Sequence, residues 1–132
     1  MFNFRLENTK EYYPLLQKRW KSHNFPDVHI LSLPENVFVA SNEYGDVYSC
    51  FMYLTNSKMV YIAYPLSNLE IPKENREGGL EYLIENMLEF AKDRGYLIAY
   101  TTSPIKPVQD ALLSEGFVVG DPSVVQYFKI IT

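Results

Sequence analysis

The sequence has few residues that carry thiol or metal chemistry. Among its 132 residues there is one cysteine, Cys50, and there are two histidines, His23 and His29. A single cysteine excludes an internal disulfide, and the two histidines show none of the spacings that zinc sites use. Cys50 stands within the strand-like run VYSCFMY, where a cysteine is usually a small buried hydrophobe. We therefore expect neither a metal site nor a catalytic thiol.

Positive charge is also scarce. Lys and Arg number 12 against 16 Asp and Glu, which gives a formal net charge of -4. Without a basic excess we expect no nucleic-acid partner, so any polyanion must be bound at a local site. No apolar run approaches the roughly 20 residues that span a bilayer, and MFNFRLENTK lacks the basic and apolar parts of a signal peptide. The sequence predicts a cytoplasmic protein without a membrane partner.

Apolar residues supply 47% of the chain and charged residues 21%. This composition allows enough burial to offset the ordering entropy of one folded domain. There is no repeat, low-complexity tract or Gly/Ser linker. We therefore expect a single domain over residues 1–132.

Hydrophobic periodicity predicts strands and helices in the first half of the chain. The alternating run FNFRLE predicts a strand, and NTKE predicts a helix start with Asn8 as its cap. The stretch VFVASNEYGDVYSCFMYLTNSKMVYIAYPL holds three β-rich runs separated by turn-like segments, which predicts an antiparallel meander. Both alternating sets of VYSCFMYL are apolar, so this strand should be central with helices on both faces.

The second half of the chain contains the clearest helix. Apolar residues recur at helical spacing from Leu80 to Ala91, and Gly95 follows the end. YLIAYTT then predicts a buried strand, PVQDALLSEG a short helix, and FVVGD with SVVQYFKII a closing hairpin. We therefore expect an α/β (α+β) fold with a mixed, mostly antiparallel sheet of six or seven strands flanked by helices.

Two glycines, Gly78 and Gly79, stand directly before this helix in IPKENREGGLEYLIENMLEF. A helix start leaves N–H groups without partners and a partial positive charge, and glycine lets the backbone approach a phosphate closely. Lys73 and Arg76 could add charged contacts. Judged on the glycines alone, a helix entry without a ligand is the simpler interpretation.

Together with its surroundings, this stretch resembles the GNAT superfamily of acyl-CoA-dependent N-acyltransferases. In that family a strand runs into a turn V-x-P-x-x-[RQ]-x-x-G-x-[GA], whose N–H groups hold the coenzyme A pyrophosphate. A helix with a Leu-Leu pair follows, then a strand and a short helix that ends in Y-x-x-x-G-F. In this sequence Pro72 takes the proline place, Gly78 the first glycine place and Leu83-Ile84 the Leu pair, while ALLSEGF carries the Gly-Phe.

The resemblance implies an N-acetyltransferase in which a primary amine attacks acetyl-CoA directly. The pyrophosphate motif is degenerate, because Asn75 stands at the Arg/Gln place and Leu80 at the last Gly/Ala place. Leu112 also stands where many members carry a Tyr proposed as general acid. The alternative is therefore a catalytically inactive GNAT-fold module with an acyl-CoA-binding or regulatory role. The cofactor-binding residues that the resemblance implies are Leu66, Ile71, Lys73, Asn75, Arg76, Glu77, Gly78, Gly79 and Leu80.

The catalytic groups are less clearly marked. Relatives that use a carboxylate base can carry it on the strand before the pyrophosphate turn, where Tyr64 and Glu70 are the candidates in this sequence. Such residues are more often a packed aromatic and a solvated acid. Because Pro65 interrupts the strand, the pantetheine-binding bulge is flanked either by Leu66 to Asn68 or by Leu69 to Ile71.

Tyrosine is abundant, with 11 residues. Most should pack in the core or pair across strands, and some could line an acceptor cleft. The resemblance implies a small-molecule or peptide amine as the acceptor and acetyl-CoA as the co-substrate, without a metal. The oligomeric state stays open, a homodimer included.

Overall fold

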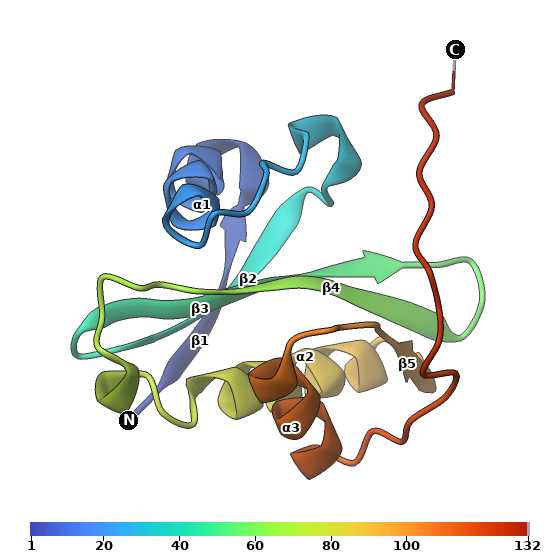
Figure 1. Cartoon of the computed structure of the whole chain (residues 1–132). Helices are drawn as coiled ribbons and strands as arrows, with labels where there is room; N and C mark the ends of the chain where they lie inside the picture. Colours follow the sequence, from blue (N-terminus) through green and yellow to red (C-terminus); the bar gives the residue numbers. More distant parts are fainter. Residues whose placement is uncertain (132) are drawn as a thin grey trace.

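The computed structural model describes residues 1–131. Figure 1 shows one sheet with α1 on one face and α2 and α3 on the other. The predicted order of strand, helix, meander, long helix, strand and short helix is confirmed. The elements are β1 (Asn3–Asn8), α1 (Thr9–Ser22), the 3-10 helix η1 (Ile30–Ser32), β2 (Asn36–Asn42), β3 (Gly45–Leu54), β4 (Met59–Ser67), the 3-10 helix η2 (Lys73–Asn75), α2 (Gly79–Asp93), β5 (Ile98–Tyr100) and α3 (Lys106–Ser114).

The sheet has five strands in the order β1-β2-β3-β4-β5. The first four pair antiparallel, and β5 runs parallel to β4 because α2 carries the chain back along the sheet. The mixed, mostly antiparallel sheet is therefore confirmed. The predicted count of six or seven strands is wrong. The burial predicted for the strand of YLIAYTT is wrong too, because Ile98 and Tyr100 of β5 are 60% and 46% exposed.

The missing strands are those of the predicted closing hairpin. The segment 117–131 contains no strand, and large apolar side chains in it are exposed, Tyr127 by 87% and Phe128 by 80%. Asp121 accepts hydrogen bonds from the N–H and the hydroxyl of Ser123 at 2.9 and 2.7 Å, which forms a local turn around Pro122. The β-propensity of these runs is real, but propensity alone does not supply a partner strand.

Each face of the sheet has its own apolar core. On one face α2 buries its stripe against β2 and β3 and reaches β4, through Phe38, Ala40, Cys50, Met52, Val60, Ile62, Leu83, Met87 and Ala91. On the other face α1 packs on β2, β3 and β4, through Tyr12, Leu16, Trp20, Val37, Val39, Phe51 and Leu66. Strand β3 is thus covered on both faces, as its two apolar sets predict. Full burial of a side chain of this size contributes about 1.5–3 kcal/mol.

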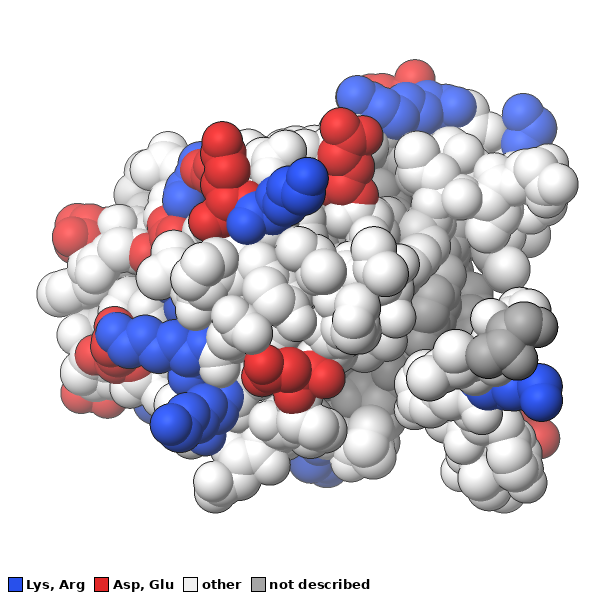
Figure 2. Space-filling model, turned by 90° about the horizontal axis from the view of Figure 1, so that it is seen from above, with Lys and Arg blue, Asp and Glu red and all other residues white. Residues whose placement is uncertain are grey.

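The view from above, in Figure 2, shows basic and acidic side chains intermixed, with mainly uncharged surface in the middle. Among the described residues, no helix combines the length and the apolarity that crossing a bilayer requires.

Candidate functional site

Strand β4 is the element on which the candidate site is built. It pairs with β3 along most of its length. On its other side it pairs with β5 only at Met59, Val60 and Tyr61. Beyond these pairs the two strands separate, although the hydroxyl of Thr101 still donates to the carbonyl of Ile62 at 2.7 Å. The β5 side of β4 is therefore open over the second half of the strand.

A bulge lies on this open half of β4. The register with β3 shifts between Ser49 and Phe51. Two residues of β4, Tyr64 and Pro65, therefore lie opposite one residue of β3. Tyr64 has a φ of +57°, in the left-handed region that non-glycine residues rarely adopt, and strain of this kind gathers at functional sites. The segment directly after the bulge is 66–68, the first of the two alternatives that the sequence left open.

The start of α2 is unusually open. Gly78 precedes the helix with a φ of +84°, and no side chain caps the helix. Within residues 1–131, no acceptor is found for the N–H groups of Glu77, Gly78, Leu80 and Glu81. Four unpaired donors at the positive end of a helix dipole suit an anion.

The two glycines each have a structural reason. The positive φ of Gly78 strains any other residue at that position. A Cβ on Gly79 would lie 2.9 Å from Cδ2 of Tyr48 and 3.1 Å from Cγ2 of Val47, so glycine lets the helix start lie close against β3. Geometry alone thus accounts for the pair, and ligand binding is a separate property that needs its own test.

A groove of about 330 Å³ opens at this helix start. Four residues expected to bind the cofactor line it together: Lys73, Glu77, Gly78 and Leu80. The remaining lining residues are Tyr48, Glu74, Glu81 and Pro107, none of which the sequence motif indicated. Three of the eight lining residues carry a carboxylate and one carries an ammonium, so an anion bound here depends on the backbone donors and Lys73.

The other expected cofactor residues support the turn and the strands. Nε of Arg76 donates to the carbonyl of Ile71 at 2.8 Å. The carbonyl of Asn75 accepts a bond from Nδ2 of Asn42 at 2.7 Å. Ile71 and Leu66 are buried in the cores on the two faces of the sheet. These residues shape the approach to the groove without lining it.

The two expected catalytic residues lie in different surroundings. Glu70 is exposed in the turn after β4 and forms an ion pair with Lys18 at 2.6 Å, and the hydrogen bond and charge of Lys18 lower its pKa. Tyr64 is half-buried on the α1 side, where burial and the neighbouring Tyr61 raise its pKa. A phenol is protonated at neutral pH, so this hydroxyl can donate a proton, although the raised pKa makes it a weaker acid.

A row of tyrosines crosses the sheet beside the bulge. Tyr53 of β3 lies opposite Tyr61 of β4, which in turn lies opposite Tyr100 of β5. The ring centroids are 5.7 Å apart in both pairs. The hydroxyl of Tyr53 donates to the carbonyl of Ser32 at 2.7 Å. Cross-strand pairing of tyrosines is therefore confirmed, and we call these three residues the tyrosine row.

Cys50 faces the α2 side of β3 and is fully buried. Its thiol donates to the carbonyl of Ala63 at 3.3 Å, and burial raises its pKa to about 12. The interpretation of this cysteine as a small buried hydrophobe is confirmed. Within residues 1–131, no group of three or more His, Cys, Asp and Glu side chains is placed to hold a metal ion.

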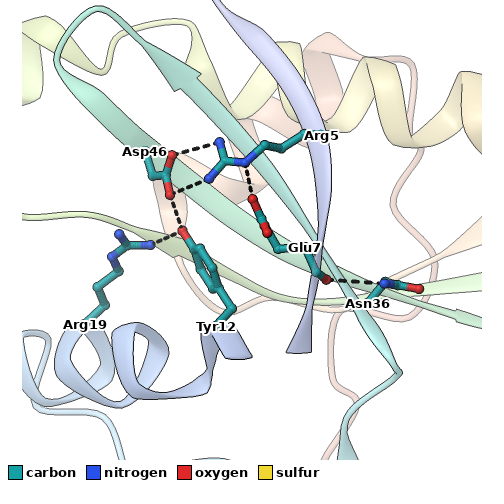
Figure 3. A network of polar contacts seen from close by, with 6 residues as sticks. All are labelled: Arg5, Glu7, Tyr12, Arg19, Asn36 and Asp46. Carbon is teal, nitrogen blue, oxygen red and sulfur yellow. Dashed lines mark hydrogen bonds and ion pairs between the residues drawn. The ribbon is translucent and has the colours of Figure 1, made fainter. Parts of the chain in front are cut away.

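A polar network joins α1 to the sheet at the start of β3 (Figure 3). Arg5 donates two bonds of 2.9 Å to the carboxylate of Asp46, and the hydroxyl of Tyr12 donates a third at 2.7 Å. Arg19, which is buried, donates to the hydroxyl of Tyr12 at 2.6 Å. Burial opposes ionisation of Asp46, but the bonds from Arg5 and Tyr12 outweigh it and lower its pKa. No sequence motif joins these positions, so the network was not predicted.

No protein-family model matches the chain, and no curated protein matches its sequence. Solved structures do match it. An aminoglycoside acetyltransferase from an uncultured soil metagenomic sample, in complex with sisomicin, is 15% identical with a TM-score of 0.73, over 98% of this chain and 97% of that chain. A predicted acetyltransferase with acetyl-CoA from Clostridium acetobutylicum is 13% identical with a TM-score of 0.67, over 96% of each chain.

Glucosamine-6-phosphate N-acetyltransferase from Arabidopsis thaliana is 9% identical with a TM-score of 0.66, over 98% of this chain and 99% of that chain. These neighbours are GNAT acetyltransferases. At such low identity the likeness shows a shared fold. The GNAT fold, expected from the turn, the helix and the Gly-Phe motif, is therefore confirmed.

Proposed function

We propose that residues 1–132 form one GNAT-type N-acetyltransferase domain, which transfers the acetyl group of acetyl-CoA to a primary amine. One observation carries the proposal. The open start of α2, with its four unpaired N–H groups, follows a strand whose β5 side is also open. Two successive sets of backbone donors are what a ligand with a pyrophosphate and an extended amide chain requires.

In this proposal the pyrophosphate binds at the start of α2. Its donors are Lys73 and the N–H groups of Glu77, Gly78, Leu80 and Glu81. The pantetheine follows the open side of β4, where its amides pair with the strand as an added strand would. The thioester then lies near the bulge at Tyr64 and Pro65.

The reaction needs one bond exchange and two proton movements. The amine nitrogen attacks the thioester carbonyl carbon, the C–N bond forms, and the C–S bond breaks. A backbone N–H at the bulge polarises the carbonyl. Tyr64, whose phenol is protonated at neutral pH, donates a proton to the departing thiolate, although its raised pKa makes it a weaker acid than a free tyrosine. The proton that the amine loses passes to Glu70 where an acceptor displaces Lys18, and otherwise to water. Water then returns a proton to Tyr64.

Titration calorimetry with acetyl-CoA tests the coenzyme site. Lys73→Glu should weaken binding by about 10-fold or more, because it reverses the charge beside the pyrophosphate. Lys10→Glu makes the same charge change on the exposed side of α1 and should leave the affinity unchanged. Gly78 is unsuitable for this test, since any side chain there strains the backbone. Absence of heat with millimolar acetyl-CoA would refute the proposal.

A GNAT-fold module that binds acyl-CoA without turnover is the second candidate. The presence of Leu112 at the family's Tyr place favours it. Release of free thiol over a panel of amines separates the two candidates. Tight acetyl-CoA binding with no acceptor-dependent thiol release would support the module and count against the transferase.

A further inference from the structure

We propose that the tyrosine row is the acceptor site, and that it selects a primary amine carried on an aromatic or apolar body rather than a polycation. This inference rests on the proposed function, because it names the acceptor class of that reaction. It concerns a surface of β3, β4 and β5 that the coenzyme motif does not include.

The position of the row suits an acceptor. Tyr61 and Tyr100 are the last paired residues before β4 and β5 separate. Tyr64, on the bulge, follows on the same strand and packs on the same face as Tyr53. This is the face that α1 covers, opposite the face on which α2 lies (Figure 1). An acceptor on the row would thus reach the bulge from the side opposite the pyrophosphate-binding helix.

The row is accessible. Tyr100 is 46% exposed, and Tyr53 and Tyr61 are half-buried. Helix α1 buries the neighbouring Phe51 and Leu66 on this face and does not bury the row itself. A ligand can therefore contact the three rings without displacing a helix.

The row offers rings and hydroxyls but no charge. Burial and the neighbouring tyrosines raise the pKa of Tyr53, and burial and Tyr61 raise that of Tyr64. At one end of the row, Glu35 lines a pocket of about 520 Å³ together with Tyr53. Two carboxylates on the α1 side are already engaged, Glu70 by Lys18 and Asp46 by Arg5. A single ammonium can be attracted by ring electrons alone. The three rings themselves offer no carboxylate to the further ammonium groups of a polycation, which would lose water on binding.

An aromatic or apolar body fits the same surface. Ring-on-ring contact adds to the burial of apolar area, and binding sites for small molecules are lined mainly by such side chains. The hydroxyls can then orient a polar substituent. The amine is the part left free to reach Tyr64 and the thioester.

The experiment measures kcat and KM for two kinds of acceptor, after acetyl-CoA binding has been established by calorimetry. We expect a higher kcat/KM for 2-phenylethylamine than for spermidine or sisomicin. Tyr61→Leu should raise the KM for 2-phenylethylamine about 3- to 10-fold and leave the affinity for acetyl-CoA unchanged. Tyr44→Leu, in the exposed turn between β2 and β3, is the matched control and should change neither value.

The inference fails if spermidine or sisomicin is the better acceptor, or if Tyr61→Leu and Tyr44→Leu have the same KM. If no acceptor turns over, calorimetry of 2-phenylethylamine with the CoA-saturated protein decides, and absence of binding overturns the inference. Lack of acetyl-CoA binding refutes the proposed function instead. If Tyr61→Leu is unfolded by circular dichroism, Tyr100→Leu on the more exposed edge replaces it.

Discussion

Helices α1 and α2 lie on opposite faces of the sheet and begin in opposite ways. At the start of α1, Oδ1 of Asn8 accepts a bond from the N–H of Glu11 at 3.2 Å. At the start of α2, Gly78 has no side chain to offer, and four N–H groups stay without an acceptor among the described residues. The chain itself supplies acceptors for the N–H groups of Thr9 and Glu11 at the first start, whereas the four N–H groups at the second start need water or a ligand. A capped start serves the fold, and an uncapped one is available for function.

The two helices are also attached by different means. Helix α1 is tied to the sheet through the network around Asp46. Helix α2 is held by its apolar stripe and by the close approach of Gly79 to β3. Each attachment can therefore be broken separately, and each substitution should affect the fold and the ligand site to a different extent.

The largest effect is expected from Gly79→Ala. The added Cβ would lie 2.9 Å from Tyr48 and push the start of α2 away from β3. Overpacking of this kind should lower the free energy of unfolding by about 2–3 kcal/mol. It should also weaken acetyl-CoA binding, and urea denaturation with calorimetry measures both. Gly120→Ala is the control, because no atom lies within 4 Å of its Cβ. Equal stability of the two variants would show that α2 does not depend on this contact.

A smaller effect, and one that depends on pH, is expected from Asp46→Asn. Because folding lowers the pKa of Asp46, its charge adds stability above its unfolded pKa of about 4, and this stability is lost as the pH falls through the lower folded pKa. The loss should be about 1.5–2 kcal/mol near pH 7 and should vanish in strong acid. Urea titrations from acid to neutral pH measure it. Glu89→Gln, exposed on α2, should show little change, and a loss independent of pH would contradict the role given to this charge.

The smallest effect is expected from Asn8→Ala. Loss of the cap should lower the free energy of unfolding by about 1 kcal/mol, and Asn8→Asp should restore most of it. Neither variant should change the affinity for acetyl-CoA, because Asn8 caps α1 and the proposed coenzyme site is at the start of α2. A loss of acetyl-CoA affinity in Asn8→Ala would contradict the assignment of the coenzyme site to the start of α2 alone.

Local patterns predicted the elements whose cause is local. The apolar stripe from Leu80 to Ala91 predicted α2, and Asn8 was predicted as the cap of α1. Pro107 indicated where α3 begins. The prediction of a closing hairpin was wrong because a strand needs a partner as well as a suitable composition. The segment 117–131 pairs with no strand among the described residues.

The candidate site could be predicted only where it is contiguous in sequence. Lys73, Glu77, Gly78 and Leu80 were found together because they belong to one turn. The contribution of Tyr48 and the order of the tyrosine row depend on strand register, which no single run of residues reveals. The placement of the bulge depends on one backbone angle, and Pro65 signalled only that the strand is interrupted.

The buried thiol of Cys50 makes this chain well suited to site-specific labelling. With a pKa of about 12 and no exposed surface, it should stay silent toward maleimide reagents at neutral pH. A cysteine introduced at Leu97, which is 79% exposed beside β5, would then take up an acceptor dye alone. The single tryptophan, Trp20 in α1, would serve as the energy donor. Energy transfer between them would follow the distance between α1 and the β5 edge as ligands bind.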